Sequence, residues 1–414
     1  MSTNTESFDN PVTPVKLNKE CTFWIFPNCA QYTATMADDP RILEIAILDE
    51  LPGELVDKAV TFFRENFPSD SKKQMDPKFF IAKIANSNPN GQGYFTVALY
   101  DGEVVGTCTA VRKTLIHKNQ IVHAVEIGDT FTSKNFRKSC RFLNLYPGTT
   151  SFDEYLNKSI FGRLATETLD RARADGVIYV YGTPNFQAKL SWLGRMNFAL
   201  VDGGFTYRIN AASIRHEFYK RSKLVHTLGR IYNNISHFLS RLVTLKYSMK
   251  LISEEDFNFA LDASDFTKNE NSIQLVNSES WIKARFINNI DKSYKIIKIE
   301  SRKDGALCGY LFFLEHERDD NFKLLILSKD IFYDKTLNKL KIPLVRIAAD
   351  RFFEYENLSI WIDTRRVSLR YRTFFGFISK PFKVDIVGKS LTENSIELQL
   401  KNFYDFQYGD SDLA

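Results

Sequence analysis

The segment around residues 157–163 carries residue types that can bind a phosphate group. Lys158 supplies a cation, Ser159 can cap a helix, and Gly162 has no Cβ that would block a ligand from the backbone. A helix predicted over residues 160–174 would present unpaired N–H groups and a partial positive charge at this end. The segment therefore indicates either an anion-binding helix N-terminus or an ordinary helix cap, because polar residues open most helices.

Two carboxylates, Glu126 and Asp129, lie on a predicted strand over residues 124–132. A carboxylate near a reacting group can act as a general base that removes a proton. In regular alternation the two side chains point to opposite faces, so at most one reaches a substrate unless a bulge re-aims the strand. We favour Glu126 as the base, with two plain surface carboxylates as the alternative. His123 points to the same face of the strand as Asp129, and it is either a base in place of Asp129 or a structural histidine.

The elements predicted between residues 41 and 209 alternate between strands and helices. A hairpin is expected at Asp101-Gly102, because this pair tolerates the positive φ of a two-residue turn. In chain order we predict strand 41–49, helices 55–66 and 76–85, strands 94–100, 103–113 and 124–132, helix 160–174, strand 177–183, helix 187–196 and strand 204–209. This order predicts an α/β unit with a mixed sheet.

The second half of the chain repeats this order of elements. A hairpin at 293–300 and 307–315 is followed by strand 323–329, helix 337–355, strand 358–363 and a helix that ends near Phe377. An internal duplication explains the repetition. We therefore divide the chain into an N-terminal arm 1–40, a first unit 41–210, a basic linker helix 211–250 and a second unit 251–414.

The linker 211–250 combines positive charge with an apolar stripe. It holds eight Lys and Arg residues and one acid, Glu217, for a net charge of +7. The apolar residues at helical spacing are Val225, Leu228, Tyr232, Ile235, Leu239 and Leu242. Three hypotheses stay open: an inter-domain helix whose stripe packs on both halves, a helix on an anionic membrane surface, and a nucleic-acid arm.

The composition excludes several classes of protein. The 414 residues carry a net charge of +5, which is too weak to predict a nucleic-acid partner. The five cysteines lack the spacing of a zinc site or a disulfide scaffold, so no metal is expected. With no signal-peptide pattern and no run of about 18 apolar residues, we expect a cytoplasmic protein that could touch the inner face of the membrane through the linker.

Three segments resemble the GNAT superfamily of N-acyltransferases. They are GDTFTSKNFRKS (128–139), KSIFGRLATETLDRARADG (158–176) and YVYGTPNFQAKLSWLGRMNF (179–198). The chain is similar to tandem GNAT proteins found with bacterial surface-polysaccharide genes. The second half keeps a family-like ending, RYRTFFGFI (370–378), but has no phosphate loop, so we interpret it as a degenerate copy that supports the first copy or shapes the acceptor cleft.

The resemblance implies a fold and an activity. The implied fold is α/β with mixed sheets, as two tandem GNAT-like domains joined by the basic helix. The implied activity is transfer of an acyl group from acetyl-CoA, or another acyl-CoA, to an amine such as an amino sugar or polysaccharide precursor. The alternative is a non-catalytic binding or regulatory protein on the same scaffold. A third hypothesis, a transferase that draws on charged tRNA, has only the basic helix in its favour.

The resemblance also assigns roles to individual residues. Those implied to contact the acyl-CoA are Ile127, Thr130, Arg137, Lys158, Ser159, Phe161, Gly162, Arg163 and Asn185. Those implied in catalysis are Glu126, Asp129 and Asn185, together with Tyr181 or Ser191 as the acid for the leaving thiolate. The chain departs from the family in two ways. An insertion between Arg137 and Lys158 splits the phosphate loop, and Trp192 stands where a tyrosine acid is usual.

Overall fold

The structure is a computed structural model of the chain. It describes residues 13–17, 21–25, 44–47, 53–66, 84, 88–100, 102–133, 160–201, 206–212, 223–259, 272–289, 292–317, 323–355, 357–363, 368–377, 382–393, 398, 402–403 and 407. The insertion between Arg137 and Lys158 and most of the predicted helix 76–85 lie outside the described residues. Within the predicted arm, β1 (Thr13–Leu17) and β2 (Cys21–Ile25) form an antiparallel pair.

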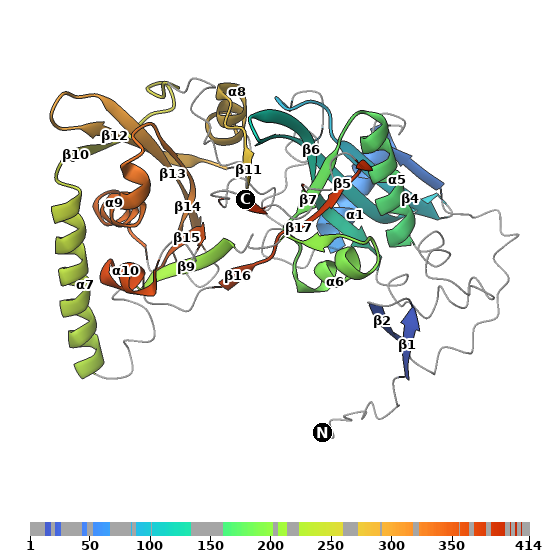
Figure 1. Cartoon of the computed structure of the whole chain (residues 1–414), viewed down its shortest axis with the longest axis horizontal. Helices are drawn as coiled ribbons and strands as arrows, with labels where there is room; N and C mark the ends of the chain where they lie inside the picture. Colours follow the sequence, from blue (N-terminus) through green and yellow to red (C-terminus); the bar gives the residue numbers. More distant parts are fainter. Residues whose placement is uncertain are drawn as a thin grey trace, which may run out of the picture.

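The first half builds a mixed sheet covered by helices (Figure 1). Its elements are β3 (Glu44–Ile47), α1 (Gly53–Asn66), β4 (Tyr94–Tyr100), β5 (Glu103–His117), β6 (Gln120–Thr132), α5 (Ile160–Ala174), β7 (Tyr179–Gly182), α6 (Phe186–Gly194) and β8 (Ala199–Leu200). The turn predicted at Asp101-Gly102 is confirmed at Gly102, whose φ of 72° is the positive value that such a turn requires. The predicted helix 160–174 is confirmed at both ends.

Helix α5 packs on the first sheet through small and aliphatic residues. Its buried positions include Ile160, Leu164, Ala165 and Leu169, which recur at helical spacing. Gly106 on β5 allows this close approach, because a Cβ there would lie 2.8 Å from Ile160 Cγ2. The start of α5 is thereby held against the sheet.

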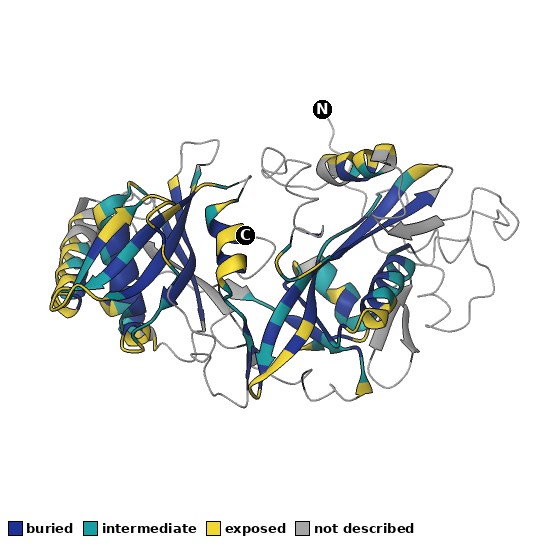
Figure 2. Cartoon of the chain, turned by 90° about the horizontal axis from the view of Figure 1, so that it is seen from above, coloured by how far each residue is buried: buried dark blue, intermediate teal, exposed yellow. Residues whose placement is uncertain are grey.

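The second half builds a seven-stranded sheet with the same order of elements. Its elements are α7 (Lys223–Val243), β10 (Tyr247–Ile252), β12 (Tyr294–Ser301), β13 (Leu307–Glu317), β14 (Lys323–Phe332), α9 (Leu337–Phe352), β15 (Asn357–Asp363) and α10 (Leu369–Phe374). Before β12 come β11 (Ser272–Leu275), α8 (Glu279–Ile282) and a short π-helix (Lys283–Ile287). In both halves buried residues gather on the strands and on the helix sides that face them (Figure 2).

The two sheets exchange strands across the predicted division of the chain. We expected strand 204–209 to complete the first unit, but β9 (Thr206–Ala212) pairs with β15 and with β16 (Phe382–Val384) in the second sheet. In return, β17 (Val387–Ser390) lies between β7 and β8 in the first sheet. The exchange is visible in Figure 1, where a green strand lies among orange ones and a red strand among green ones.

A second link joins the halves through β11. This strand pairs antiparallel with the end of β5 and parallel with β18 (Asn402–Phe403). The first sheet therefore contains nine strands, three of which come from the second half. The boundaries that we drew along the chain do not coincide with the boundaries of the sheets.

Helix α7 lies at the outer edge of the second half, next to α9 (Figure 1). Of the predicted apolar stripe, Leu239 packs against the core, whereas Leu228, Ile235 and Leu242 are exposed. The hypothesis that the stripe packs on both halves is therefore wrong for these three residues.

Candidate functional site

Strands β6 and β7 pair over a short stretch. Their parallel register runs from Ala124 opposite Tyr179 to Glu126 opposite Tyr181. Beyond this point β7 ends at Gly182, while β6 continues to Thr132. Strand β6 therefore continues past the end of β7, which leaves a gap in the sheet beside the second half of β6.

Strand β6 carries a bulge immediately after the gap begins. The register with β5 shifts so that Asp129 and Thr130 together oppose Cys108. Asp129 has a φ of 41°, and its Oδ2 accepts a hydrogen bond from Thr109 Oγ1 at 3.1 Å. A bulge was the condition under which Glu126 and Asp129 could share one site, and that condition is met.

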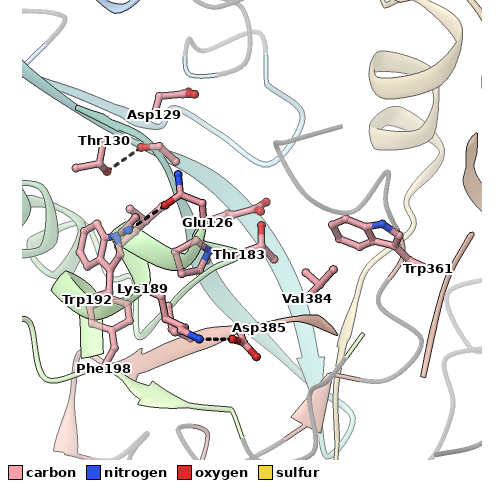
Figure 3. A pocket seen from close by; sticks show the side chains of 17 residues that line it. Glu126, Asp129, Thr130, Thr183, Lys189, Trp192, Phe198, Trp361, Val384 and Asp385 are labelled. Atoms are coloured by element: carbon pink, nitrogen blue, oxygen red, sulfur yellow. Dashed lines mark hydrogen bonds and ion pairs between the residues drawn. The ribbon is translucent and has the colours of Figure 1, made fainter. Parts of the chain in front are cut away.

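A cavity of about 490 Å³ lies at this gap. Its volume is typical of a small-molecule site. The lining residues are Glu126, Ile127, Gly128, Asp129, Thr130, Gly182, Thr183, Pro184, Asn185, Ala188, Lys189, Trp192 and Phe198 from the first half, and Trp361, Val384, Asp385 and Val387 from the second. Figure 3 shows Glu126 and Thr183 between Trp192 on one side and Trp361 on the other. Both halves therefore form the cavity.

Glu126 is part of a buried ion pair. Its Oε2 lies 3.2 Å from Lys113 Nζ, and the two side chains are 2% and 3% exposed. The ammonium of Lys113 lies 6.0 Å from the ring centre of Trp281. Glu126 thus lines the cavity, and its negative charge is paired with Lys113, which is not among the lining residues.

A second ion pair crosses from one half to the other. Lys189 Nζ on α6 lies 2.5 Å from Asp385 Oδ2, which precedes β17. Both residues line the cavity (Figure 3). On the same helix, Asn185 caps the first turn, because its Oδ1 accepts from Ala188 N–H at 2.9 Å. The first turn of α6 is therefore fixed to the cavity wall.

An aromatic cluster closes the cavity on the side of α5. Trp192 packs edge-on against Phe161 and tilted against Phe198, with ring centres 5.1 Å and 5.0 Å apart. Phe161 belongs to the first turn of α5. The N-terminal end of this helix therefore contacts Trp192, which lines the cavity. Trp192 fills the position at which we expected the acid of the family.

The structure brings five of the predicted site residues together. Glu126, Ile127, Asp129, Thr130 and Asn185 all line the cavity. Their individual roles remain predictions. Three others, Arg137, Lys158 and Ser159, lie outside the described residues, so the predicted diphosphate contacts remain predictions as well.

The remaining predicted residues do not line the cavity. Phe161, Gly162 and Arg163 lie on the first turn of α5: Phe161 packs against Trp192, Gly162 is buried, and Arg163 is half-buried. Tyr181 is fully buried in the core, where it contacts Phe403 at 4.8 Å between ring centres. Ser191 lies on α6 outside the cavity lining. The predicted roles of Tyr181 and Ser191 therefore remain predictions, and neither residue lines the cavity.

Several cavity residues were not predicted from the sequence. Lys189 is within the segment that resembles the family, but its partner Asp385 is 196 residues away. Trp361 and Val384 come from the second half, where we expected only support or a contribution to the acceptor cleft. They line the cavity because the two sheets exchange strands. The periodicity of residues along a single strand does not predict such an exchange.

The corresponding gap in the second half is filled by the chain itself. Strand β14 pairs with β15 only from Leu324 to Ile326 and has its own register shift near Ser328. There the backbone N–H of Asp330 donates to Gln407 Oε1 at 2.7 Å. Lys341 on α9 lies 2.5 Å from Asp330 Oδ1. The backbone that would face a ligand is thus already bonded, which supports our interpretation of a degenerate copy.

Among the described residues, no group of three or more His, Cys, Asp and Glu side chains could hold a metal ion. In the same part of the chain, none of the helices has both the length and the apolar character that crossing a bilayer requires.

Comparison with known proteins gives a likeness in structure. In sequence, no family model and no curated protein matches the chain. An N-myristoyltransferase of Saccharomyces cerevisiae, solved with myristoyl-CoA and inhibitors, is 11% identical with a TM-score of 0.50, over 92% of this chain and 86% of that one. A GCN5-related N-acetyltransferase of Kribbella flavida is 12% identical with a TM-score of 0.49, over 84% and 71%. A tandem GNAT protein from the clavulanic acid pathway has a TM-score of 0.47, over 85% and 99% at 11% identity.

At these identities the likeness concerns the fold. The score for the N-myristoyltransferase carries this conclusion, and the two lower scores carry no argument of their own. Together with the two mixed sheets, it shows that this chain has the α/β fold of that N-myristoyltransferase, in two halves with matching element order. The predicted fold class is confirmed.

Proposed function

We propose that the protein is an acyl-CoA-dependent N-acyltransferase, with acetyl-CoA as the first donor to test. One observation carries this proposal: β6 continues past the end of β7, and a cavity that holds carboxylates lies there. Backbone N–H groups beside such a cavity can donate hydrogen bonds to the carbonyl oxygen of a thioester, and a carboxylate can remove the proton of an amine. The structural neighbour that binds myristoyl-CoA supports a thioester of coenzyme A as donor.

The proposed reaction uses the cavity residues in two roles. The amine nitrogen attacks the thioester carbon, its proton passes to Glu126 directly or through water, and the carbon–sulfur bond breaks. Asp129 is the alternative base, because the bulge places it on the same wall. With Trp192 at the position of the expected acid, coenzyme A leaves as a thiolate, which is feasible for a thiol with a pKa near 8.5.

For the acceptor, we propose an amine of a sugar or polysaccharide precursor. The cavity offers three carboxylates, Glu126, Asp129 and Asp385, which suit an ammonium group and hydroxyl groups. Trp192 and Trp361 add flat apolar faces on opposite sides (Figure 3). A polyhydroxylated amine satisfies both kinds of surface.

A non-catalytic binding protein is the second candidate function. It is favoured by the position of Tyr181 in the core and by the burial of Glu126, whose carboxylate is already paired with Lys113. Such a protein would bind an acyl-CoA without turning it over.

Calorimetry and a thiol-release assay distinguish the two functions. We expect micromolar binding of acetyl-CoA or a longer acyl-CoA, and release of coenzyme A when amino sugars are added. Glu126→Gln should reduce turnover by roughly 10²–10⁴-fold, the usual contribution of a general base, with little effect on binding. Glu167→Gln is the matched control, because this carboxylate lies on the outer part of α5 and pairs with Arg171.

Each outcome assigns the function differently. Binding without turnover for any amine would favour the non-catalytic protein. No binding of any acyl-CoA would overturn both proposals. Unchanged turnover in both Glu126→Gln and Asp129→Asn would show that neither is the base. Loss of binding in Arg137→Glu with Lys158→Glu would support the predicted diphosphate contacts.

A further inference from the structure

The inner face of α7 is polar, which reverses the usual pattern of a surface helix. Ser236, Ser240 and Thr244 recur every four residues and are 1%, 0% and 4% exposed. Ser240 Oγ donates to Ser236 O at 2.8 Å, and Thr244 Oγ1 donates to Ser240 O at 2.9 Å. Because Ser240 and Thr244 satisfy their hydroxyl groups within the helix, these two side chains can be buried against the second half at little cost. The Ser236 hydroxyl is buried beside them without a hydrogen-bond partner among the described residues.

Polar contacts to neighbouring elements fix the rotation of α7 about its axis. Arg346 of α9 donates from Nη2 to Asn233 Oδ1, and His237 Nε2 lies 3.9 Å from Asp350 Oδ2. Tyr232 donates from its hydroxyl group to Thr373 O of α10. These contacts hold the polar side inward, so the opposite side of the helix must face outward.

The outer face of α7 is a continuous apolar stripe. Its members are Leu228, Ile231, Ile235, Phe238, Leu242 and, in the turn that follows, Leu245, with exposures of 56%, 51%, 52%, 59%, 45% and 56%. The alternating spacing of three and four residues places the five helical members within a band of about 80° around the helix. Such a large exposed apolar patch marks an interaction surface.

The charge around the stripe identifies the kind of partner. The segment after Glu217 contains no acidic residue until Glu254, and the exposed residues Arg241 and Lys246 lie close to the stripe. A second copy of α7 would oppose cations with cations, whereas helices that pair through such stripes use complementary charges at the flanks. An anionic lipid surface satisfies both the stripe and the cations.

We propose that α7 binds flat on an anionic membrane surface, with the apolar stripe inserted among the lipid headgroups. The 21 residues of α7 form a rod of about 30 Å that lies at the outer edge of the molecule (Figure 1). The candidate cavity lies toward the middle of the molecule. Docking through α7 therefore leaves both halves and the cavity outside the bilayer.

Vesicle flotation of the full chain tests the proposal. We expect the protein to float with vesicles of phosphatidylcholine containing about 30 mol% phosphatidylglycerol, and to remain unbound with phosphatidylcholine alone. Added salt should weaken the binding, since the Debye length falls to about 3 Å at 1 M. Equal binding to both vesicles, or binding to neither, would overturn the proposal.

Two variants separate the stripe from the charges. Ile235→Asp with Phe238→Asp should abolish flotation, while Ile121→Asp, an equally exposed position on the first sheet at 65%, should not. Arg241→Gln with Lys246→Gln should weaken binding by roughly fivefold for each charge, the usual contribution of a cation near such a surface. Circular dichroism and acyl-CoA binding should be unchanged in all these variants, because none of the residues lines the cavity.

The oligomeric state provides the decisive alternative. If light scattering shows a dimer that becomes a monomer in the Ile235→Asp, Phe238→Asp variant, the stripe belongs to a second copy and the membrane proposal is wrong. A monomer that binds only the anionic vesicles supports it.

Discussion

Glu126 and Lys113 form a charge pair that both the candidate chemistry and the stability of the first half depend on. The two groups are 3.2 Å apart and almost fully buried. A buried pair of this kind is costly to break, because removing one partner leaves the other as an uncompensated charge. Effects of Glu126 variants on activity must therefore be separated from effects on folding.

Substitution of either partner alone should destabilise the protein more than substitution of both. We expect Lys113→Met to reduce the free energy of unfolding by about 3–5 kcal/mol. The double variant Lys113→Met, Glu126→Gln should recover most of that loss, because no buried charge remains. Urea denaturation followed by circular dichroism measures both values. A cost below about 1 kcal/mol for Lys113→Met would show that the pair behaves like an exposed one.

Cys108 should make the stability of the protein sensitive to alkaline pH. It lies opposite the bulge, and burial raises the pKa of its thiol from 9.0 to about 11. Because the folded state holds the proton more tightly, its stabilising effect is complete below pH 9 and is lost as the pH rises through 11. Over this window we expect a loss of about 2–3 kcal/mol. Cys108→Ala should show a flatter decline than the wild type between pH 8.5 and 11, and equal slopes would contradict the prediction.

Residue patterns in the sequence predicted part of the candidate site. The family resemblance pointed to Glu126 and Asp129, and the alternation along 124–132 indicated that a bulge is needed to bring them together. The bulge itself depends on how β5 and β6 pair, and the pairing is not encoded in either strand alone. Asp385 could not be predicted as a site residue, because its partner Lys189 lies 196 residues away in the chain.

At the scale of elements, β17 is a short strand with a large effect. It joins the second half to β7 and β8, and its first residue, Val387, lines the cavity. The next residue of β17, Gly388, lies directly against the side chain of Tyr179, where a Cβ would clash with the hydroxyl group. Only glycine lets β17 lie this close to β7.

Gly388→Ala should therefore destabilise the protein and widen the gap beside the cavity. We expect a loss of about 1–3 kcal/mol, as for other overpacked positions, and weaker acyl-CoA binding because Val387 moves with the strand. Gly194→Ala is the control, since no atom lies within 4 Å of the added Cβ. Thermal unfolding and calorimetry measure the two effects. Equal melting temperatures for the two variants would contradict this account of β17.

Helices and strands were easier to predict than their assembly into sheets. Apolar spacing gave the bounds of α5, whose face is buried against one sheet. The strand predicted at 204–209 exists as β9, but it belongs to the other sheet. Periodicity shows that a strand has a buried face, whereas the choice between two similar sheets depends on contacts between residues far apart in the chain.

At the scale of the whole molecule, the strand exchange should make the two halves unfold together. The second sheet contains β9 from the first half, and the first sheet contains β17 from the second. If either half unfolds, the sheet of the other half loses the strand that the unfolded half contributes. The ion pair between Lys189 and Asp385 adds a further link beside the cavity.

We therefore expect one cooperative transition rather than two. Hydrogen exchange measured in increasing urea should show β5 and β13 losing protection at the same concentration, because each sheet depends on the other. Deletion of residues 382–414 provides a sharper test. It removes only second-half residues, yet β6 and β7 of the first sheet should lose protection, since β17 no longer covers the edge of β7. The protection of β10 and β12, at the far edge of the second sheet, is the internal comparison. If deletion leaves β7 protected while β9 and β15 open, the first sheet folds without its exchanged strand, and the halves are independent units.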